Sequence, residues 1–389
     1  RIRPNITRLT LTLQESWFVR NFFTYNVTRW TPEGEKHYKR VMYRRRGANE
    51  VDVPTGAFLR AFEVVAEKCD LYLTDEWADP EVQIDTRGLR WYQAEDVKAI
   101  LEHRSVLIVY PPGTGKTTLA KRIAECVPNT LIISPTRLLT GENVVTYSRA
   151  QRMDLKGLTC LIVDEAHHVP AKTVYDIMWE CDAPLRIGLT ATPFRTDGLE
   201  CLIDACFAHT IVRRLPELAE FVSVPEVYTI RTGFRATCYE WHELVKQMIR
   251  DERRNRLIAR VVRMLPKPVL VLTRWIEHAE TLAEMCSASL ITSKHRGEFG
   301  DITVCSPVAG EGVDLPELRS LVIAGAGKSP VETLQRAGRV MRPSRERKII
   351  VDLIDDGPIL WRHGVLRVRA YRSWGLNVTR IRADERLLL

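Results

Sequence analysis

The sequence predicts an α/β protein with two doubly wound lobes in tandem, preceded by a small α+β domain. Two observations carry this prediction: short apolar runs alternate with helical patterns from residue 89 onward, and prolines interrupt that texture near residues 210–228. Such runs are typical of strands that are buried on both faces of a parallel sheet. The 389 residues suffice for two or three domains.

The first 88 residues are expected to form the small α+β domain. They contain no nucleotide motif, and their apolar patterns are short and mixed. The expected elements are a strand, a short helix, a basic loop, an amphipathic helix and two short strands, at residues 9–13, 15–23, 29–46, 54–66, 71–73 and 82–84.

The remaining residues are expected to divide into a first lobe, 89–215, and a second lobe, 216–389. Pro216 and Pro225 punctuate the connection between them. Buried parallel strands are predicted at residues 106–109, 131–133, 158–163, 187–189, 269–272, 302–304, 321–323 and 349–351.

Composition narrows the class of protein. Hydrophobic residues make up 45% of the chain and charged residues 27%, as in ordinary globular proteins. The net charge of +8 favours an anionic partner. No apolar run approaches the ~20 residues of a membrane span. Nine scattered cysteines without a CxxC pair predict a reduced, cytoplasmic protein without a zinc ribbon or disulfide framework.

A phosphate-binding loop follows the predicted strand at 106–109. Strand, glycine-rich loop and helix form the context in which backbone N–H groups cradle phosphates. Lys116 would reach the β- and γ-phosphates, and the Thr117 hydroxyl would hold Mg²⁺. Tyr110 stands where the general pattern has glycine. The expected ATP-binding residues of this loop are Pro112, Gly113, Thr114, Gly115, Lys116, Thr117 and Thr118.

An acidic pair ends the predicted strand at 158–163. Asp164 would hold Mg²⁺ directly or through water, and Glu165 would orient and deprotonate the attacking water. The alternative is an acidic cap at a strand end without chemistry. Behind a phosphate loop, the catalytic interpretation is favoured.

Several arginines lie close together in the string at 335–342. Arg336, Arg339 and Arg342 follow a helical spacing with nothing acidic among them. One interpretation is a solvated basic face. The other is that Arg339 and Arg342 stabilise charge on the γ-phosphate in the transition state, with Gln335 beside them.

Taken in order, these strings resemble the motifs of a superfamily 2 helicase over roughly residues 89–360. The Thr-Ala-Thr-Pro box at 190–193 and the Gln-Arg-Ala-Gly-Arg box at 335–339 argue against AAA+ ATPases and superfamily 1 helicases. The further residues that carry the resemblance are Arg90, Gln93, Pro135, Thr136, Arg137, Thr146, His167, Thr190, Thr192, Arg274, Ser306, Gly312 and Asp314.

The resemblance implies RecA-like lobes that use ATP and Mg²⁺. Gln93 with Arg90 would read adenine, and Gly312 with Asp314 would face the nucleotide. His167, Thr190 and Thr192 would couple the γ-phosphate to the nucleic-acid groove. That groove would hold a single strand through phosphate contacts, which bind without reading sequence. The implied contacts are Pro135, Thr136, Arg137, Thr146, Arg274 and Ser306.

Within superfamily 2, the chain resembles the XPB, RadD and UvsW-like DNA helicases. The Arg-Trp-Tyr-Gln string at 90–93 and the segments 194–198 and 218–227 carry this likeness. The N-terminal region resembles the small duplex-binding domain of UvsW-type phage helicases. The group implies remodelling of forked or branched DNA in a bacterial or phage-infected cytoplasm, with replication or recombination proteins as partners. The arginine cluster Arg44, Arg45 and Arg46 would contact duplex DNA, or be a solvated hairpin tip.

Three other functions stay open. The chain could move along duplex DNA without separating strands, because no wedge or pin can be identified in the sequence. It could act on RNA, which stimulation of ATP hydrolysis by RNA over DNA would reveal. A nucleic-acid-binding protein without catalysis would need a dead ATP site, whereas Lys116, Asp164 and Glu165 are all present.

Overall fold

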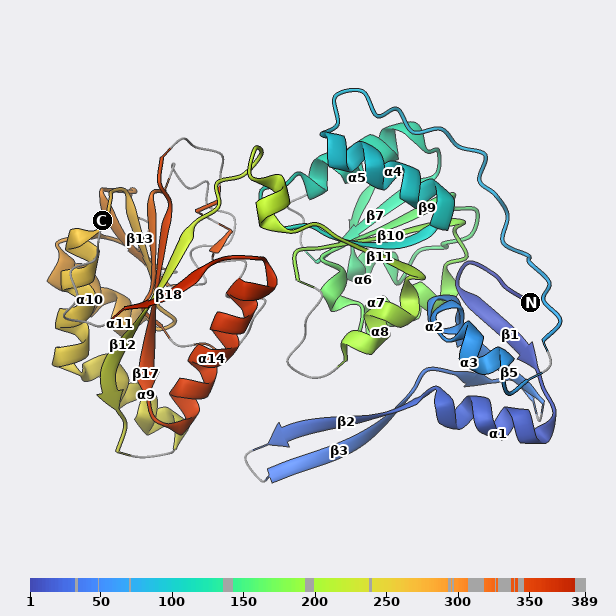
Figure 1. The fold of residues 1–389 in the computed structure, drawn as a ribbon, viewed down its shortest axis with the longest axis horizontal. Helices are drawn as coiled ribbons and strands as arrows, with labels where there is room; N and C mark the ends of the chain where they lie inside the picture. The colour runs from blue at the N-terminus through green and yellow to red at the C-terminus, as the bar shows by residue number, and fades with distance from the viewer. Residues whose placement is uncertain are drawn as a thin grey trace. The chain divides into compact units, whose positions relative to one another are not determined.

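The computed structural model describes residues 1–31, 34–47, 49–69, 71–135, 143–192, 199–237, 240–292, 295, 297–306, 318–325, 327, 337, 338, 340, 341 and 346–381 (Figure 1). The chain forms two compact units, one of residues 1–110 and 115–212 and one of residues 111–114 and 213–389. Each unit contains one parallel sheet with helices on both faces, which confirms the predicted fold class. The exact domain boundaries stay a prediction.

The first unit is built on a six-stranded sheet of order β11-β6-β10-β9-β7-β8 in which all neighbours run parallel. Its strands are β6 (Ser105–Val109), β7 (Thr130–Ser134), β8 (Val144–Thr146), β9 (Cys160–Asp164), β10 (Leu185–Thr190) and β11 (His209–Val212). Its helices are α4 (Trp91–His103), α5 (Lys116–Cys126), α6 (Tyr147–Ala150), α7 (Lys172–Glu180) and α8 (Glu200–Cys206). Helices α4 and α5 cover one face and α6, α7 and α8 the other (Figure 1).

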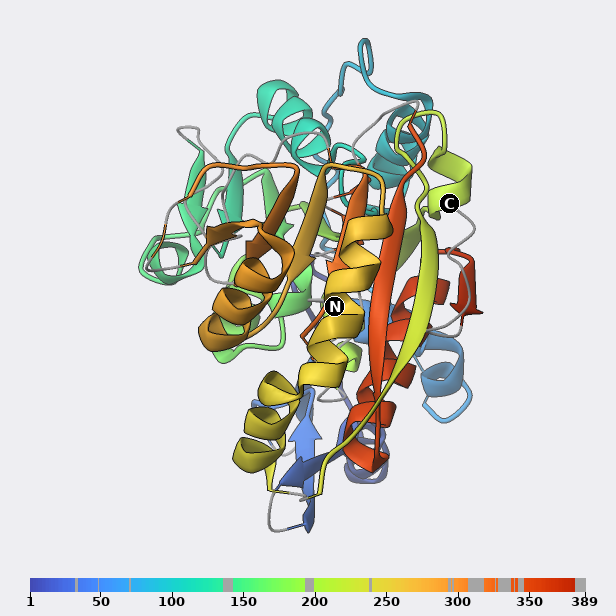
Figure 2. The same cartoon turned by 90° about the vertical axis from the view of Figure 1, so that its left-hand side faces the viewer.

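The second unit is built on a seven-stranded parallel sheet of order β14-β15-β13-β16-β17-β12-β18. Its strands are β12 (Glu226–Arg235), β13 (Val269–Leu272), β14 (Ser289–Ile291), β15 (Ile302–Cys305), β16 (Ser320–Ile323), β17 (Ile349–Asp356) and β18 (Val378–Ile381). Its helices are α9 (Trp241–Arg250), α10 (Glu252–Met264), α11 (Ile276–Cys286) and α14 (Pro358–Ser373). Helices α10 and α11 lie on one face of the sheet and α14 on the opposite face (Figures 1 and 2).

The buried strands of both sheets agree with the apolar runs in the sequence. The eight predicted strands are all present, as β6, β7, β9, β10, β13, β15, β16 and β17. The sequence analysis did not anticipate β8, β11, β12, β14 and β18, and β8, β11, β14 and β18 each lie at a sheet edge. Edge strands bury one flank only, so their sequences are more polar and give a weaker signal.

The N-terminal region forms a small α+β arrangement, as predicted, but its details differ. An antiparallel sheet of order β1-β5-β4 carries three helices, and β2 pairs only with β3 as a separate ribbon. The bounds are β1 (Ile6–Thr10), α1 (Leu13–Phe22), β2 (Thr24–Thr31), β3 (Gly34–Val41), β4 (Arg44–Arg45), β5 (Glu50–Pro54), α2 (Thr55–Arg60) and α3 (Phe62–Ala66). The basic loop expected at 29–46 is therefore wrong, because most of that segment is paired strand.

The two strands expected at 71–73 and 82–84 are also wrong. Neither segment pairs in a sheet among the described residues, and Asp75 makes only an isolated bridge to Ile2. Tyr72 is 97% exposed and Leu73 is also exposed, so this stretch has little apolar surface buried that would favour a strand.

The N-terminal region packs on helix α8 of the same unit. One apolar cluster joins Leu9, Val53 and Phe58 to Leu202 and Ala205. Gly56 allows the close approach, because a Cβ there would lie 2.7 Å from the carbonyl oxygen of Ala205. Arg60 then donates to the carbonyls of Asp204 and Phe207 at 3.2 and 3.1 Å, at the end of α8.

Candidate nucleotide site

The loop between β6 and α5 has the geometry of a phosphate-binding loop. Gly113 and Gly115 have φ angles of 78° and 85°, in the region that favours glycine. A Cβ on Gly115 would also lie 2.8 Å from Nε2 of Gln93, so both its conformation and its surroundings require glycine. Thr114 is buried and its hydroxyl donates to the Pro111 carbonyl at 2.5 Å, which fixes the turn. The first turn of α5 leaves Thr117 and Thr118 exposed.

Gln93 braces this loop from helix α4. Its Nε2 donates to the Gly115 carbonyl at 3.0 Å, and its Oε1 accepts from the Arg90 N–H at 3.0 Å. The Arg90 guanidinium in turn donates to the Tyr92 hydroxyl at 3.0 Å. Gln93 is 1% exposed with both ends of its amide engaged. Its predicted contact with adenine, and that of Arg90, stay predictions.

Lys116 is half-buried at the start of α5. Its Nζ donates to the Tyr110 carbonyl at 3.1 Å. Burial lowers the pKa of Lys116, against the opposing effect of the Glu165 and Asp164 carboxylates. The N–H groups at the start of α5 and this ammonium together form a site suited to an anion.

Asp164 is the last residue of β9 and lies at the carboxyl edge of the first sheet. Glu165 follows in a left-handed conformation with φ of 51°. A non-glycine residue in this conformation stores strain, which is common at functional sites. Ser134, at the end of β7, donates to Asp164 Oδ2 at 3.3 Å, and the Tyr147 hydroxyl donates to the Asp164 carbonyl. Neither Ser134 nor Tyr147 was among the predicted site residues. The register of β7 with β9 brings Ser134 to the acidic pair.

The two carboxyls differ in their electrostatics. Burial, reinforced by the charge of Glu165, raises the pKa of Asp164. Burial works in the same direction on Glu165, but the hydrogen bond from His167 and the charge of Lys116 outweigh it, so its pKa is lowered. Glu165 therefore stays ionised, as a base must. The Asp164 carboxylate and the exposed Thr117 hydroxyl are oxygen ligands of the kind Mg²⁺ prefers, so these residues fit the predicted ion.

His167 connects the acidic pair to the segment after β10. It is 5% exposed, and its Nδ1 lies 3.2 Å from Glu165 Oε2 and 3.2 Å from Thr190 Oγ1. Thr190 then donates to the Thr192 carbonyl at 3.0 Å and accepts from the Thr192 N–H at 3.1 Å. The three residues predicted to couple ATP to the groove thus form one continuous chain of contacts that starts at Glu165.

The structure places the other predicted contacts as follows. Thr146 directly precedes α6 and is half-buried, as is Pro135 after β7, and Arg274 is exposed after β13. Ser306 is 2% exposed after β15, so its hydroxyl is turned away from solvent in this conformation. These roles stay predictions. Outside the described residues lie Thr136, Arg137, Gly312, Asp314, Gln335, Arg339 and Arg342.

The arginine cluster of the N-terminal region lies in and directly after β4, which pairs antiparallel with β5. Arg44 lies 3.4 Å from Asp176 and 4.5 Å above the Trp179 ring, both on α7. Arg46 donates to the buried Asp52 at 2.7 Å, and Arg45 donates to the Gly47 carbonyl at 2.9 Å. All three side chains are exposed yet have a partner within the unit, and their duplex contact stays a prediction.

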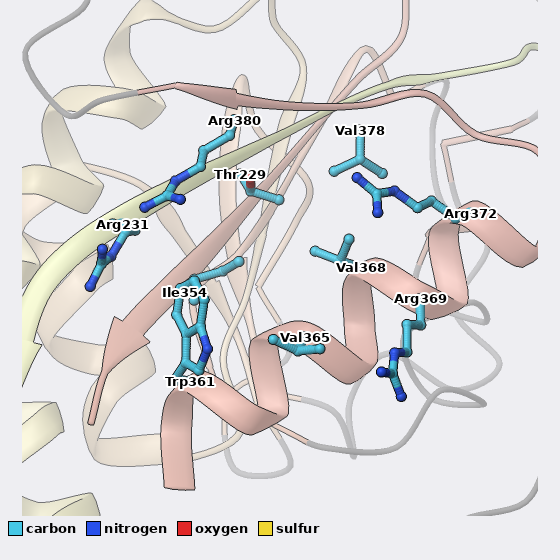
Figure 3. A pocket seen from close by; sticks show the side chains of 10 residues that line it. All are labelled: Thr229, Arg231, Ile354, Trp361, Val365, Val368, Arg369, Arg372, Val378 and Arg380. Carbon is cyan, nitrogen blue, oxygen red and sulfur yellow. The ribbon is translucent and has the colours of Figure 1, made fainter. Parts of the chain in front are cut away.

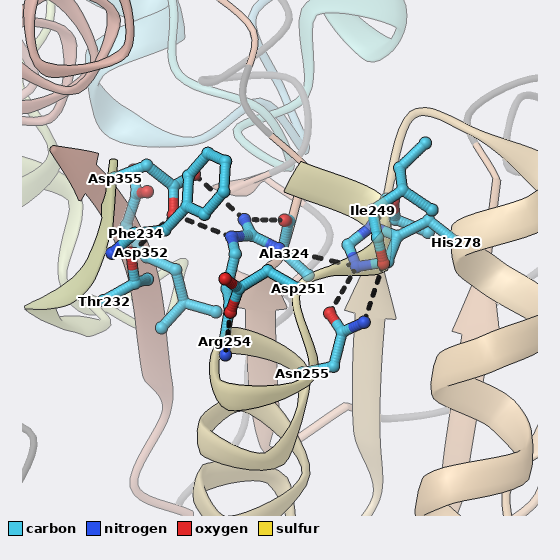
Figure 4. Close-up of polar contacts among 12 residues, drawn as sticks. Thr232, Phe234, Ile249, Asp251, Arg254, Asn255, His278, Ala324, Asp352 and Asp355 are labelled. Atoms are coloured by element: carbon cyan, nitrogen blue, oxygen red, sulfur yellow. Dashed lines mark hydrogen bonds and ion pairs between the residues drawn. The ribbon is translucent and has the colours of Figure 1, made fainter. Parts of the chain in front are cut away.

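The carboxyl edge of the second sheet also carries charged residues, and these are fully enclosed (Figure 4). Arg254 of α10 donates to both oxygens of Asp355 at 2.7 and 3.0 Å and to the Ala324 carbonyl at 2.7 Å. His278 contacts Thr273 Oγ1 at 2.7 Å and Asn255 Oδ1 at 3.1 Å. A second buried pair joins Arg367 of α14 to Asp352, and both side chains are at most 1% exposed.

Among the described residues, no group of three or more histidine, cysteine or acidic side chains could hold a metal ion. No helix in the described part of the chain is long and apolar enough to cross a membrane.

Comparison with known families identifies the two lobes. Residues 140–195 match the family described as type III restriction enzyme, res subunit, and residues 278–344 match the helicase conserved C-terminal domain. Both matches fall within the segments that carry the predicted helicase motifs. The first match contains the acidic pair, His167 and Thr190, and the second reaches from His278 through the arginine string. The chain is accordingly an enzyme, a nucleic-acid-dependent ATPase.

Curated relatives are moderately similar over most of the chain. "DNA 3'-5' translocase XPB2" of Sulfurisphaera tokodaii is 27% identical, across 70% of this chain and 83% of that protein. "Putative DNA 3'-5' helicase Rad25" of Haloarcula marismortui is 26% identical, across 78% of this chain and 58% of that protein. The chain thus spans less than two thirds of the length of some of these relatives.

A solved structure supports the fold. "The fragment structure of a putative HsdR subunit of a type I restriction enzyme from Vibrio vulnificus YJ016" superposes with a TM-score of 0.56 at 13% identity, across 97% of this chain and 93% of that chain. At this identity the likeness concerns the fold alone. The more specific resemblance to UvsW-type helicases stays a prediction.

Proposed function

We propose that this superfamily 2 helicase is a DNA-dependent motor that unwinds or remodels branched DNA, coupling ATP hydrolysis to closure of its two lobes. The observation that carries the proposal is the contact chain from Glu165 through His167 to Thr190 and Thr192. A motor needs a structural route between the atoms that hydrolyse ATP and the segments that hold its track. Names of relatives that describe DNA translocases and helicases support DNA as that track.

The chemistry follows from the positions of the side chains. Lys116 and the N-terminus of α5 would hold the β- and γ-phosphates, and Asp164 with Thr117 would hold Mg²⁺. When bound, the ion would neutralise charge on the phosphates. Glu165, kept ionised by His167 and Lys116, accepts the proton of the attacking water.

His167 links the protonation state of Glu165 to the segment after β10. Its Nδ1 is within 3.2 Å of both Glu165 and Thr190, and a single N–H shared between two acceptors favours the more negative one. When Glu165 takes up a proton, its attraction for His167 weakens, and the existing contact between His167 and Thr190 is strengthened. The balance of contacts at the segment after β10 therefore differs before and after water attack. Arg339 and Arg342, with Gln335, complete the γ-phosphate environment in this proposal.

The test is ATP hydrolysis in the presence of single-stranded DNA, blunt duplex, a three-way fork, a four-way junction or RNA, with strand separation followed in parallel. The proposal expects the strongest stimulation from branched DNA, with resolution of the junction. Lys116→Ala serves as the inactive control. Equal rates with and without every nucleic acid would contradict the proposal.

A second candidate is a translocase that moves along duplex DNA without separating strands. The printed name of the Sulfurisphaera relative, a DNA 3'-5' translocase, favours it. Stimulation by plain duplex without strand separation would identify this activity and make a partner protein the next question. Preference for RNA would instead identify an RNA helicase.

The setting of this activity is part of the proposal. A filamentous virus of Sulfolobus and an iridescent virus of invertebrates each carry a helicase relative, at 26% and 25% identity. These relatives support a role in viral or phage DNA replication and recombination. We propose the cytoplasm of a bacterial or phage-infected cell as its location.

A further inference from the structure

A pocket of about 270 Å³ lies between helix α14 and the sheet edge formed by β12 and β18, entirely within the second unit (Figure 3). Helix α14 contributes Trp361, Val365 and Val368 to it, which follow one face of the helix. Ile354 of β17 and Val378 of β18 complete an apolar floor. The nucleotide site described above uses none of these residues.

The rim of this pocket is strongly cationic. Arg231 and Arg380 come from the strand side, and Arg369 and Arg372 come from α14 (Figure 3). Arg231 pairs with Asp356. No carboxylate in the described part of the chain pairs with the other three, so the rim sets four guanidiniums against one carboxylate.

One arginine of helix α14 has a structural role and does not belong to the rim. Arg367 is 1% exposed and donates to Asp352 and to the carbonyls of Gly327 and Leu353. Arg369 and Arg372 are exposed and have no such partners among the described residues. Clustered, exposed guanidiniums attract a polyanion, because their like charges raise the local positive potential.

The aromatic side chain defines the ligand further. Trp361 is 39% exposed, and the guanidinium carbons of Arg231 and Arg380 lie 5.1 and 5.9 Å from its ring. Free inorganic phosphate would leave this apolar floor unused, and a purely apolar ligand would leave the arginines unused. A flat base joined to phosphates uses both. The volume is below the ~300–1,000 Å³ of drug-sized sites, which fits one unit of a polymer.

We propose that this pocket holds one nucleotide of a single-stranded nucleic acid, with the base against Trp361 and the aliphatic floor and the phosphates at the arginine rim. The inference rests on the proposed function, because it assumes a nucleic-acid track. It adds a contact of the second lobe that uses none of the residues assigned to the helicase motifs. The strand would gain affinity there in addition to its grip in the motor groove.

The test compares matched charge reversals on the same helix. Arg369→Glu and Arg372→Glu change the rim, and Arg362→Glu changes an exposed arginine of α14 that does not line the pocket. Binding of a fluorescein-labelled oligothymidylate is measured across salt concentrations. Each rim variant is expected to bind about tenfold more weakly, and its log–log salt slope to fall by about 0.7, the loss of one phosphate contact. Arg362→Glu is expected to match the parent within about twofold, with only the general effect of a distant exposed charge.

Variants of Trp361 provide a second test, because they change binding of the oligonucleotide without changing the charge of the rim. Trp361→Ala is expected to weaken binding about fivefold or more, whereas Trp361→Phe keeps a stacking ring and most of the affinity. A strand that carries 5-iodouracil should cross-link to Trp361 on irradiation. ATP hydrolysis without nucleic acid should be the same in every variant, because none of these residues lies in the nucleotide site.

The outcomes separate this inference from the proposed function. If nucleic acid stimulates ATP hydrolysis but the rim variants bind like Arg362→Glu, the pocket assignment is wrong and the motor stands. If a polyaspartate peptide binds through these arginines while the oligonucleotide ignores them, the pocket takes an acidic protein segment and the assignment is again wrong. If the parent chain binds no nucleic acid at all, both proposals fail.

Discussion

The carboxyl edges of the two parallel sheets both carry aspartates, but the two edges differ in how the charge of these aspartates is neutralised. In the first unit, Asp164 and Glu165 are half-buried beside Lys116, and burial raises the pKa of Asp164. In the second unit, Asp352 and Asp355 are completely enclosed, and each is bound by its own buried arginine.

The difference lies in whether the chain balances its own charge. Asp355 receives two hydrogen bonds from Arg254 and one from Thr232, so nothing remains for a ligand to neutralise. Asp164 accepts a long hydrogen bond from Ser134 and a backbone hydrogen bond from Glu165, and it shares the charge of Lys116 with Glu165. In the proposed function a divalent cation and phosphates balance the remaining charge of the first edge, while the second edge is a structural clamp formed by the buried Arg254–Asp355 and Arg367–Asp352 pairs. Burial of a carboxylate by itself does not distinguish the two.

Loss of the base should give the largest effect. In Glu165→Gln the side chain keeps its size but can no longer accept a proton, so ATP hydrolysis should fall by ~10²–10⁴-fold. Binding of ATP should persist, because Lys116 and the phosphate loop are unchanged. Phosphate release at saturating nucleic acid and the affinity for a fluorescent ATP analogue would check both expectations.

Glu125→Gln is the matched control, since this carboxylate is exposed on α5 of the same unit. It should hydrolyse ATP at the parent rate. A Glu165→Gln protein with undiminished hydrolysis would mean that the acidic pair is a structural cap and would remove the contrast between the two edges.

Loss of the buried Arg254–Asp355 pair should destabilise the fold, although neither residue belongs to the nucleotide site. Arg254→Met leaves Asp355 buried without its cation, which costs about 3–5 kcal/mol. Replacing both partners, as in Arg254→Met with Asp355→Leu, should recover much of this loss, because no uncompensated charge remains. Urea unfolding followed by circular dichroism would measure both variants.

Arg256→Met supplies the comparison on the same helix. Arg256 is exposed and pairs with Glu252 one turn away, so its loss should cost under about 1 kcal/mol. Equal destabilisation by Arg254→Met and Arg256→Met would show that the buried pair is not a clamp.

The same contrast explains what could be predicted from sequence. Buried parallel strands are recognisable as apolar runs, and the residues at their carboxyl ends follow from the strand positions. The sequence therefore located Asp164 and Glu165 at the end of a buried strand, while the roles of Lys116, Asp164 and Glu165 stay predictions. The role of Arg254 could not be predicted, because its string Glu-Arg-Arg-Asn-Arg looks like a solvated helix face. Only the tertiary position of Asp355, about a hundred residues later, makes it a buried group.

The N-terminal region shows the same limit. Residues 29–46 are polar, which predicted a loop, yet residues 34–41 pair as β3 with β2. Pairing between two neighbouring strands depends on backbone hydrogen bonds, which the polarity of the side chains does not reveal. Likewise, the partners of Arg44 lie on α7, and no local pattern could connect them.

Stability should also depend on pH, because Arg254 of the buried pair contacts the His278 ring. Burial, reinforced by the charge of Arg254, lowers the pKa of His278 to about 3. In the unfolded chain its pKa returns to about 6.5, so between these values the unfolded state binds a proton that the native state excludes. Stability should therefore fall as pH drops through this window, by about 2 kcal/mol between pH 7 and pH 5. Urea unfolding at the two pH values measures this loss.

His278→Gln isolates this contribution from other titrating groups. Glutamine can still hydrogen-bond to Thr273 or Asn255 but does not titrate, so the variant should be less stable than the parent at pH 7 and should lose less on acidification. An identical loss of stability in the parent and in His278→Gln would mean that protonation of the imidazole does not disrupt the buried Arg254–Asp355 pair. The second edge would then tolerate a change of charge.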